Sequence, residues 1–248
     1  MAPKSALTDL RVRAAATGAA SEASRISTLD RLQLELNLLV AWAYEKNLQL
    51  EADEFLSRID ATHGEHHVYY DAMRERYFKI THGSDKTHAG FALTVDTNFH
   101  IGKRTQRYLA VPFLREATPF EYLARLQLFN LTFQDSIEVE GVIVDSGKEA
   151  IVTSQPFIQG NAATSAEVAD FMAKRAFLPV PDVTAGRGNS ASYFRISDAI
   201  AIFDTHGQNF LVSGSEIIPI DALIMVANED LVSYLTISKE ERDAELGS

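Results

Sequence analysis

No cysteine occurs among the 248 residues of the chain. Its absence excludes a disulfide framework, a thiolate zinc site and a cysteine nucleophile, and it agrees with a reducing compartment. Basic residues are in the minority, because 23 lysines and arginines face 34 aspartates and glutamates, which gives a formal net charge of −11. Nucleic acid and anionic membranes are bound by basic surfaces, so the sequence predicts neither of them as a partner.

Long hydrophobic runs are missing as well. The most apolar helical stretch, residues 32–44, is interrupted by Glu35 and Asn37. No window approaches the roughly 20 apolar residues that span a bilayer. The first 26 residues are rich in alanine, serine and threonine and lack the apolar core of a secretory signal. The remaining composition, with 46% hydrophobic and 23% charged residues, is typical of a soluble globular protein, and we expect a cytoplasmic location.

The order of the expected elements indicates an α+β fold, because helices and strands come in separate runs instead of alternating. Capping signals mark helix starts at Ser27, Thr118 and Thr164, the last two with a glutamate three residues on. Residues 82–110 are assigned to no regular element, and residues 184–192 form a glycine-rich loop. In chain order we expect helices at 27–47 and 51–59, a hairpin at 67–81, a helix from 118, a hairpin at 137–157, a helix at 164–175, a strand at 199–204 and a hairpin at 209–221.

Four polar side chains collect around the last strand and hairpin. Asp204 ends the strand, His206 follows it, and Asn209 comes five residues after Asp204. Because the hairpin returns the chain, Asp221 at its end can lie beside Asn209. Carboxylate and amide oxygens that converge on one point form a hard-cation site of the kind that Mg²⁺ uses. Turn formation would also explain Asp204 and Asn209, whereas Asp221 lies between two apolar runs, where an unpaired carboxylate is costly.

Phosphoryl transfer from a nucleotide needs such a cation site, together with positive charge across the phosphates and a carboxylate that orients the acceptor. The sequence resembles the protein-kinase-like superfamily, and most closely the Ser/Thr/Tyr kinase domain found in polyvalent proteins of phages and conjugative elements. The resemblance covers residues 63–226. It rests on these stretches, which follow the family's order: GEHHVYYD, RYFKIT, TPFEYLARLQLFN, EGVIV, IVTSQPFIQG, DTHGQNFLV and IPID.

The resemblance implies a minimal two-lobed protein-kinase-like fold. Its parts are a small antiparallel sheet lobe, a truncated second lobe and a helical N-terminal extension. Together with the composition of the two ends, this predicts four segments: a flexible N-terminal tail (1–26), a helical extension (27–60), the minimal kinase-like domain (61–237) and a solvated C-terminal tail (238–248). The expected setting is the cytoplasm of a bacterial host cell.

The resemblance also implies which residues bind the nucleotide. Lys79 would contact the α and β phosphates of ATP, and Glu121 would pair with Lys79. Residues 155–158, which include Gln155 and Phe157, would form a hinge whose backbone groups bind the adenine. A solvent-facing strand lysine and a helix-capping glutamate are the alternative interpretations of Lys79 and Glu121.

For the reaction itself, the resemblance implies that Asp204 orients the acceptor hydroxyl while Asn209 and Asp221 hold Mg²⁺. His206 matches the Asp-x-His spacing of kinases of the aminoglycoside-phosphotransferase type, in which the histidine braces the catalytic loop. The predicted activity is ATP- and Mg²⁺-dependent transfer of the γ-phosphoryl group to a hydroxyl acceptor, namely Ser, Thr or Tyr of a protein.

Two alternatives remain open. Only Gly64 in THGEHH represents the glycine-rich loop that such kinases place over the phosphates, and only 27 residues follow Asp221. Both features favour a catalytically inactive pseudokinase or interaction module. The spacing of Asp204 and His206, together with the missing platform for a peptide, favours a small-molecule kinase of the aminoglycoside-phosphotransferase type. The expected partners are a nucleotide and an unidentified protein or small-molecule acceptor.

Two metal interpretations of the histidines are rejected. His63, His66 and His67 form a cluster, but neighbouring residues of a strand point to opposite faces, so His66 and His67 cannot bind one ion. We expect a solvated or loop cluster instead. Asp204 and His206 also have the spacing of a non-haem iron facial triad, yet no histidine follows His206 to complete it.

Overall fold

The computed structural model describes residues 1–16, 27–63, 65–82, 90–145, 149–186, 188 and 190–247. The chain divides into two compact units. Unit 1 consists of Met1–Thr94 and Glu116–Phe157, and unit 2 consists of Val95–Arg115 and Ile158–Ser248. Helices and several small sheets occur together, which confirms the α+β fold. Among the described residues, none of the helices is long and apolar enough to cross a membrane.

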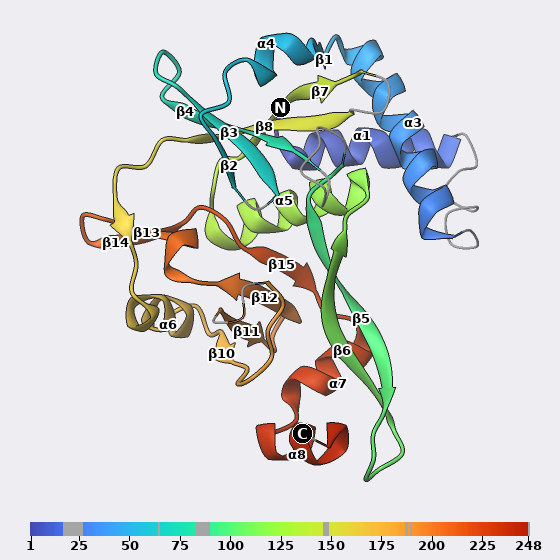
Figure 1. Ribbon diagram of the computed structural model, residues 1–248, viewed down its shortest axis with the longest axis vertical. Coiled ribbons are helices and arrows are strands. Elements are labelled where there is room, and N and C mark those ends of the chain that lie inside the picture. Colours follow the sequence, from blue (N-terminus) through green and yellow to red (C-terminus); the bar gives the residue numbers. More distant parts are fainter. Residues whose placement is uncertain are drawn as a thin grey trace. The chain divides into compact units, whose positions relative to one another are not determined.

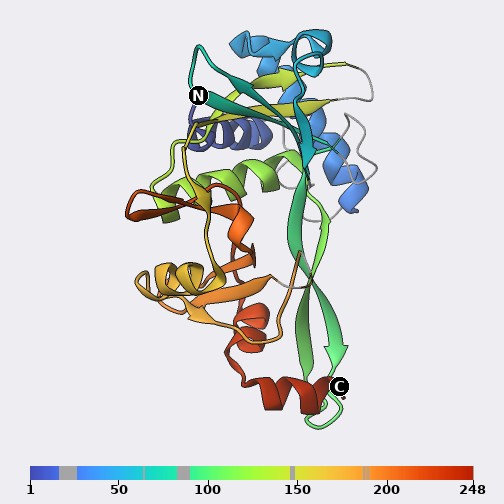
Figure 2. The same ribbon diagram turned by 60° about the vertical axis from the view of Figure 1, so that its left-hand side comes forward.

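Unit 1 is built around a six-stranded sheet in the order β1-β7-β8-β4-β3-β2. Its strands are antiparallel neighbours except for the parallel pair of β1 and β7. Figures 1 and 2 show α4 on one side of this sheet and α1 and α5 on the other. The elements are α1 (Pro3–Ala16), α3 (Thr28–Lys46), β1 (Gln49–Leu50), α4 (Ala52–Leu56), β2 (Ala61–His63), β3 (His66–Asp71), β4 (Arg76–Thr81), α5 (Pro119–Phe133), β7 (Glu138–Ile143) and β8 (Ala150–Pro156).

One face of this sheet carries an apolar core. Phe78 and Ile80 of β4 point to it together with Tyr69 of β3, and Phe55 of α4 packs against them. Tyr69 and Phe78 stack with their ring centroids 4.8 Å apart. Because successive side chains of a strand alternate, Lys79 lies on the opposite face of the sheet.

Helices α3 and α5 begin at the predicted caps. The Thr118 side chain accepts a hydrogen bond from the N–H of Glu121, and the Glu121 carboxylate accepts one from the N–H of Thr118 at 2.9 Å. Helix α3 has Ser27 as its N-cap and ends at Asn47, which adopts the left-handed conformation. These predictions are confirmed because each cap depends only on residues within about one helical turn.

The prediction of a flexible tail is wrong for residues 3–16, which form α1. The helix buries Ala6, Leu7, Leu10 and Ala14. These residues recur at helical spacing, but two of them are alanines, so the apolar stripe has little contrast with the rest of a segment rich in small residues. Residues 17–26, the rest of the predicted tail, lie outside the described part of the chain.

Unit 2 holds a four-stranded sheet in the order β10-β11-β12-β15 and a three-stranded sheet in the order β14-β13-β9. Phe203 of β12 and Phe210 of β13 are both 0% exposed, so the loop between these strands rises directly from the core of the unit. The elements of this part are β9 (Asn161–Ala162), α6 (Ser165–Ala173), β10 (Leu178–Pro179), β11 (Ala191–Arg195), β12 (Ile200–Thr205), the single 3₁₀ turn η1 (Gly207–Asn209), β13 (Phe210–Ser213), β14 (Glu216–Pro219), β15 (Leu223–Val226), α7 (Glu229–Thr236) and α8 (Lys239–Leu246).

Within the stretch 82–110, left unassigned in the sequence, the structure places most of a two-stranded ribbon. It consists of β5 (Leu93–Ile101) and β6 (Tyr108–Glu116), as Figure 1 shows. The burial of β5 does not alternate, and its last four residues are all exposed. A strand without one buried face lacks the period-two pattern by which strands are recognised. Residues 83–89 lie outside the described part of the chain.

The C-terminal tail is also predicted wrongly, because residues 239–246 form helix α8. The Arg242 guanidinium donates to the carbonyls of Ile237 and Pro181, both at 2.6 Å. The Glu245 carboxylate accepts hydrogen bonds from the N–H groups of Arg104 at 3.1 Å and Thr105 at 3.0 Å, at the tip of the ribbon. The run of charged residues predicts a solvated segment, but Arg242 and Glu245 are buried and form hydrogen bonds with backbone groups.

The contact between Glu245 and the ribbon tip predicts a dependence on pH. The Thr105 and Arg104 backbone N–H groups bind the charged carboxylate and hold the pKa of Glu245 below its ordinary value of 4.5. A carboxylate with a lowered pKa stabilises the folded state at neutral pH, and this contribution is lost as the pH falls below about 4.5 through the folded pKa. We expect Glu245→Gln to lower the urea midpoint at pH 7 and to lower it much less at pH 3.5.

The matched control is Glu216→Gln, which removes an exposed carboxylate from β14 of the same unit. Its effect on the midpoint should be small at both pH values. A Glu245→Gln effect that stays the same from pH 7 to pH 3.5 would contradict the assignment of the ribbon contact to the charged form.

Candidate functional site

Asp204 is held in an uncommon backbone conformation at the end of β12. Its φ is 55°, in the left-handed region that non-glycine residues seldom occupy and that aspartate tolerates better than most. Its carbonyl accepts hydrogen bonds from the N–H of His206 at 3.0 Å and from Nδ2 of Asn209 at 2.8 Å. The loop after β12 is therefore closed by bonds to the Asp204 backbone.

Asn209 faces the Asp204 side chain and ends the 3₁₀ turn η1. Its Nδ2 is 3.4 Å from Oδ2 of Asp204, and its backbone N–H donates to the His206 carbonyl at 2.9 Å. Because the amide nitrogen is used on Asp204, the amide oxygen is the atom that Asn209 can offer to a cation. Oxygen atoms of amides are among the donors that Mg²⁺ accepts, so the Asn209 side chain fits its predicted role as a ligand of such an ion.

Asp221 is brought beside this loop by two independent pairings. The β13–β14 hairpin returns the chain, and the Asn209 carbonyl accepts the N–H groups of Ile220 at 2.9 Å and Asp221 at 3.3 Å. Strand β15 then pairs with β12 so that Leu223 lies opposite Phe203. The expected approach of Asp221 to Asn209 through the hairpin is confirmed, and the β12–β15 register also places it next to the end of β12.

His206 lies next to Asp204 on the same loop. Its Nε2 is 3.6 Å from Oδ2 of Asp204, and the two side chains are 14% and 22% exposed. When the imidazole is protonated, it forms an ion pair with the carboxylate across this distance. Side-chain contacts thus bring Asp204, His206 and Asn209 together within unit 2, and a backbone hydrogen bond places Asp221 beside Asn209.

Lys79 of β4 belongs to unit 1. It is half-buried on the sheet face opposite Phe78 and Ile80. On the same face Gln155 of β8 donates to the Asp135 carboxylate, just beyond the C-terminal end of α5. Burial raises the pKa of Asp135, while the Gln155 hydrogen bond and the positive charge of Lys79 oppose this effect. Lys79 therefore acts electrostatically on this carboxylate.

Glu121 has a basic partner that the sequence did not predict. It forms an ion pair with Arg31 of α3, in addition to its capping bond with Thr118. The neighbouring Glu35 of α3 accepts the N–H of Phe120 at 2.9 Å, so α3 also caps the start of α5. Burial raises the pKa of Glu35. The pairing of Glu121 with Lys79 stays a prediction.

The predicted hinge contains the point at which the chain passes from unit 1 to unit 2, between Phe157 and Ile158. Gln155 is buried and lies opposite Tyr77 of β4 in the sheet. The N–H of Phe157 donates to the Glu75 carbonyl at 2.8 Å. An adenine bound here would therefore need other backbone groups of residues 155–158.

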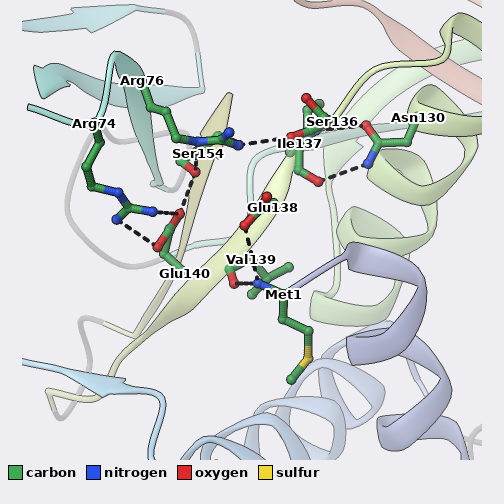
Figure 3. A network of polar contacts seen from close by, with 10 residues as sticks. All are labelled: Met1, Arg74, Arg76, Asn130, Ser136, Ile137, Glu138, Val139, Glu140 and Ser154. Atoms are coloured by element: carbon green, nitrogen blue, oxygen red, sulfur yellow. Dashed lines mark hydrogen bonds and ion pairs between the residues drawn. The ribbon is translucent and has the colours of Figure 1, made fainter. Parts of the chain in front are cut away.

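A polar network fixes the strands that lead to this segment, as Figure 3 shows. Arg76 donates from Nε to the Ser154 hydroxyl at 2.7 Å, and Arg74 binds both oxygens of Glu140, at 3.1 and 2.8 Å. Burial alone would raise the pKa of Glu140, but the hydrogen bonds from Arg74 and Ser154 outweigh it and lower this pKa. The network links β4, β7 and β8 on the side of the predicted hinge.

Two members of the histidine cluster are buried in strand β3, contrary to the prediction of a solvated or loop cluster. His66 and His67 are 3% and 5% exposed. They point to opposite faces of β3, as expected, because His66 contacts the Tyr122 hydroxyl of α5 at 3.1 Å whereas His67 packs on His82 with ring centroids 4.7 Å apart. Gly64, the predicted phosphate-loop glycine, lies outside the described residues.

One neighbour of the loop was missed in the sequence. Gly186 of the glycine-rich stretch lies against the Asp204 side chain. The glycines themselves were visible, but a contact between residues 18 positions apart is set by the pairing of β11 with β12 and not by local sequence.

Residues 113–228 match the model of a family described as Serine/Threonine/Tyrosine Kinase found in polyvalent proteins. The match confirms the family resemblance seen in the sequence over residues 113–226, and the resemblance of residues 63–112 stays a prediction. It includes Glu121, Asp204, Asn209 and Asp221, whereas Lys79 precedes it. No curated protein and no solved structure matches the chain.

Proposed function

We propose, from the kinase family whose model matches residues 113–228, that this protein is an ATP- and Mg²⁺-dependent phosphotransferase. Its acceptor would be a hydroxyl group, namely Ser, Thr or Tyr of a protein. The observation that carries the proposal is the approach of Asp204, Asn209 and Asp221 within unit 2, inside the segment that the family matches.

The side chains of the loop support this chemistry as follows. Asp204 would accept a hydrogen bond from the acceptor hydroxyl and take its proton as the new bond forms. Asn209 and Asp221 would hold Mg²⁺ through oxygen atoms. The ion would supply positive charge that neutralises the phosphates. Lys79, on a strand of unit 1, would add a second positive charge for the α and β phosphates.

Asp221→Ala tests the proposed cation site. We expect the Mg²⁺-dependent affinity for a nonhydrolysable ATP analogue to fall by at least about tenfold, since losing even an outer-shell partner of a metal ligand costs 10–100-fold. The measurement is isothermal titration calorimetry of the analogue with and without Mg²⁺. Asp170→Ala is the matched control, because it removes an exposed aspartate of α6 in the same unit, and its affinity should equal that of the wild type.

If Asp221→Ala binds nucleotide and Mg²⁺ as tightly as the wild type, the metal assignment is wrong. If the wild type binds both but transfers no phosphoryl group to protein or small molecule, the chain is an inactive scaffold of the same family. The hydrogen bond from the Phe157 N–H to the Glu75 carbonyl favours the inactive scaffold, because this N–H is one of the backbone donors that was expected to bind adenine.

A small-molecule acceptor is favoured by the contact of His206 with Asp204, which brings an Asp-x-His loop together. A screen with radiolabelled ATP against aminoglycosides and other hydroxylated metabolites, run beside protein substrates, distinguishes the acceptors. Label that appears only on protein would eliminate the small-molecule alternative.

A further inference from the structure

Gly186 lies so close to Asp204 that no side chain fits between them. Its φ is +115°, and a Cβ built on it would be 2.4 Å from Oδ1, 2.6 Å from Cγ and 2.7 Å from Cβ of Asp204. Carbon atoms in folded proteins do not approach other heavy atoms this closely. Any residue other than glycine at position 186 must therefore move the Asp204 side chain or the backbone of the loop.

The loop that carries Gly186 is tied down on both sides. The Ser192 hydroxyl donates to the Val183 carbonyl at 2.5 Å, and the N–H of Val180 donates to the Ser192 carbonyl at 2.8 Å. Val183 and Ala185 are each 3% exposed, so the residues just before Gly186 are anchored in the core of unit 2. Withdrawal of Gly186 from Asp204 would disturb these contacts.

The other side of the contact is fixed as well. The Thr205 hydroxyl donates to the Ala191 carbonyl at 2.6 Å, which ties the end of β12 to the end of the glycine-rich loop. The register of β11 and β12 shifts between Ala191 and Tyr193, beside this point. Such bulges re-aim side chains next to functional sites. The Asp204 carboxylate is thus held between Gly186 and the amide of Asn209.

We propose that Gly186 is a positioning residue for Asp204, and that the absence of a side chain at position 186 fixes where this carboxylate meets the acceptor hydroxyl. The consequence for catalysis rests on the proposed function, whereas the geometric contact does not. The three atoms nearest to a Cβ at position 186 all belong to Asp204, so we expect the effect to fall on the step in which Asp204 takes part and not on the binding of nucleotide and Mg²⁺.

Gly186→Ala is the first test. We expect kcat for phosphoryl transfer to fall about 10- to 100-fold, because a displacement of about 1 Å in a reacting group has an effect of this size. The nucleotide KM and the calorimetric affinity for the Mg²⁺–nucleotide complex should not change. A merely structural role would lower activity and binding together through loss of folded protein.

Two glycines of unit 2 serve as controls. Gly188→Ala adds a methyl group two residues away in the same loop, where no heavy atom lies within 4 Å of the added Cβ. Gly214→Ala places a side chain at a positive φ of +63°, a milder strain than at the +115° of Gly186, also with nothing within 4 Å. Neither variant should change kcat. Equal losses in Gly188→Ala or Gly214→Ala would overturn the proposal, because they would show that loop rigidity or φ strain alone explains the effect.

A double-mutant cycle tests the contact without any assay of activity. Asp204→Gly removes all three atoms that the added Cβ would meet, and glycine suits the φ of 55° at this position. We expect Gly186→Ala to lower the urea midpoint clearly in the wild type and much less in the Asp204→Gly background. Equal shifts in the two backgrounds would overturn the proposal. A wild type without transfer activity would overturn the proposed function, while the cycle would still decide whether position 186 controls Asp204.

Discussion

Asp204→Asn will reduce the rate of phosphoryl transfer by about 10²–10⁴-fold, the usual contribution of a positioned general base. Asparagine keeps the size of aspartate and tolerates the positive φ of this position, so the loop should keep its fold. It cannot take the proton of the acceptor hydroxyl. Because Asn209 and Asp221 are unchanged, the affinity for nucleotide and Mg²⁺ should stay that of the wild type.

The measurement is transfer of label from γ-labelled ATP under single-turnover conditions, together with calorimetric binding of the nucleotide. Asp198→Asn is the control, since this aspartate pairs with Arg195 in the turn between β11 and β12, away from the loop bonds of Asp204. Its rate should match that of the wild type. Undiminished transfer by Asp204→Asn would remove Asp204 from the reaction.

Arg125→Met will destabilise unit 1 by about 3–5 kcal/mol, the usual cost of leaving one charge of a buried pair without its partner. Arg125 of α5 and Glu65 form an ion pair in which both residues are buried, at 6% and 9% exposed. Both also bind Leu93, whose N–H donates to Glu65 at 2.6 Å and whose carbonyl accepts from Arg125 at 2.7 Å. The substitution removes the cation paired with the buried Glu65 carboxylate.

Urea or thermal unfolding of the variants measures this effect. Arg58→Met is the control in the same unit, because Arg58 and Glu54 form an exposed pair whose loss should cost about 0–1 kcal/mol. The double variant Arg125→Met with Glu65→Gln should recover part of the lost stability, since the unpaired charge is removed. A single Arg125→Met variant as stable as Arg58→Met would show that the pair is not buried in solution.

The features that could be predicted from the sequence are those that depend on near neighbours. The capping boxes at Thr118 and Thr164 are both present, and the β13–β14 hairpin brings Asp221 to Asn209 as its length and turn imply. Each of these features joins residues that are close in the chain or connected by a tight turn, so their order alone determines the contact.

The features that could not be predicted depend on distant partners. The apolar residues of helix α1 are small, so the helix cannot be recognised without the surface on which they pack. In α8, Glu245 is buried because backbone N–H groups at the tip of the ribbon bind its carboxylate. Arg31 and Glu121 form an ion pair although they are 90 positions apart. Gly186 lies against Asp204 because strands β11 and β12 pair with each other. The spacing of residues in the sequence does not predict such contacts, because the tertiary fold brings the partners together.

The division into units has a consequence for any attempt to dissect this protein. The chain changes units between residues 94 and 95, between 115 and 116, and again between 157 and 158, so neither unit is one uninterrupted segment. A fragment that starts at Ile158 would carry Glu245 without the turn of the ribbon that it binds. Separate production of the C-terminal portion would therefore require residues 95–115 to be supplied by circular permutation or as a second peptide, and not by simple truncation.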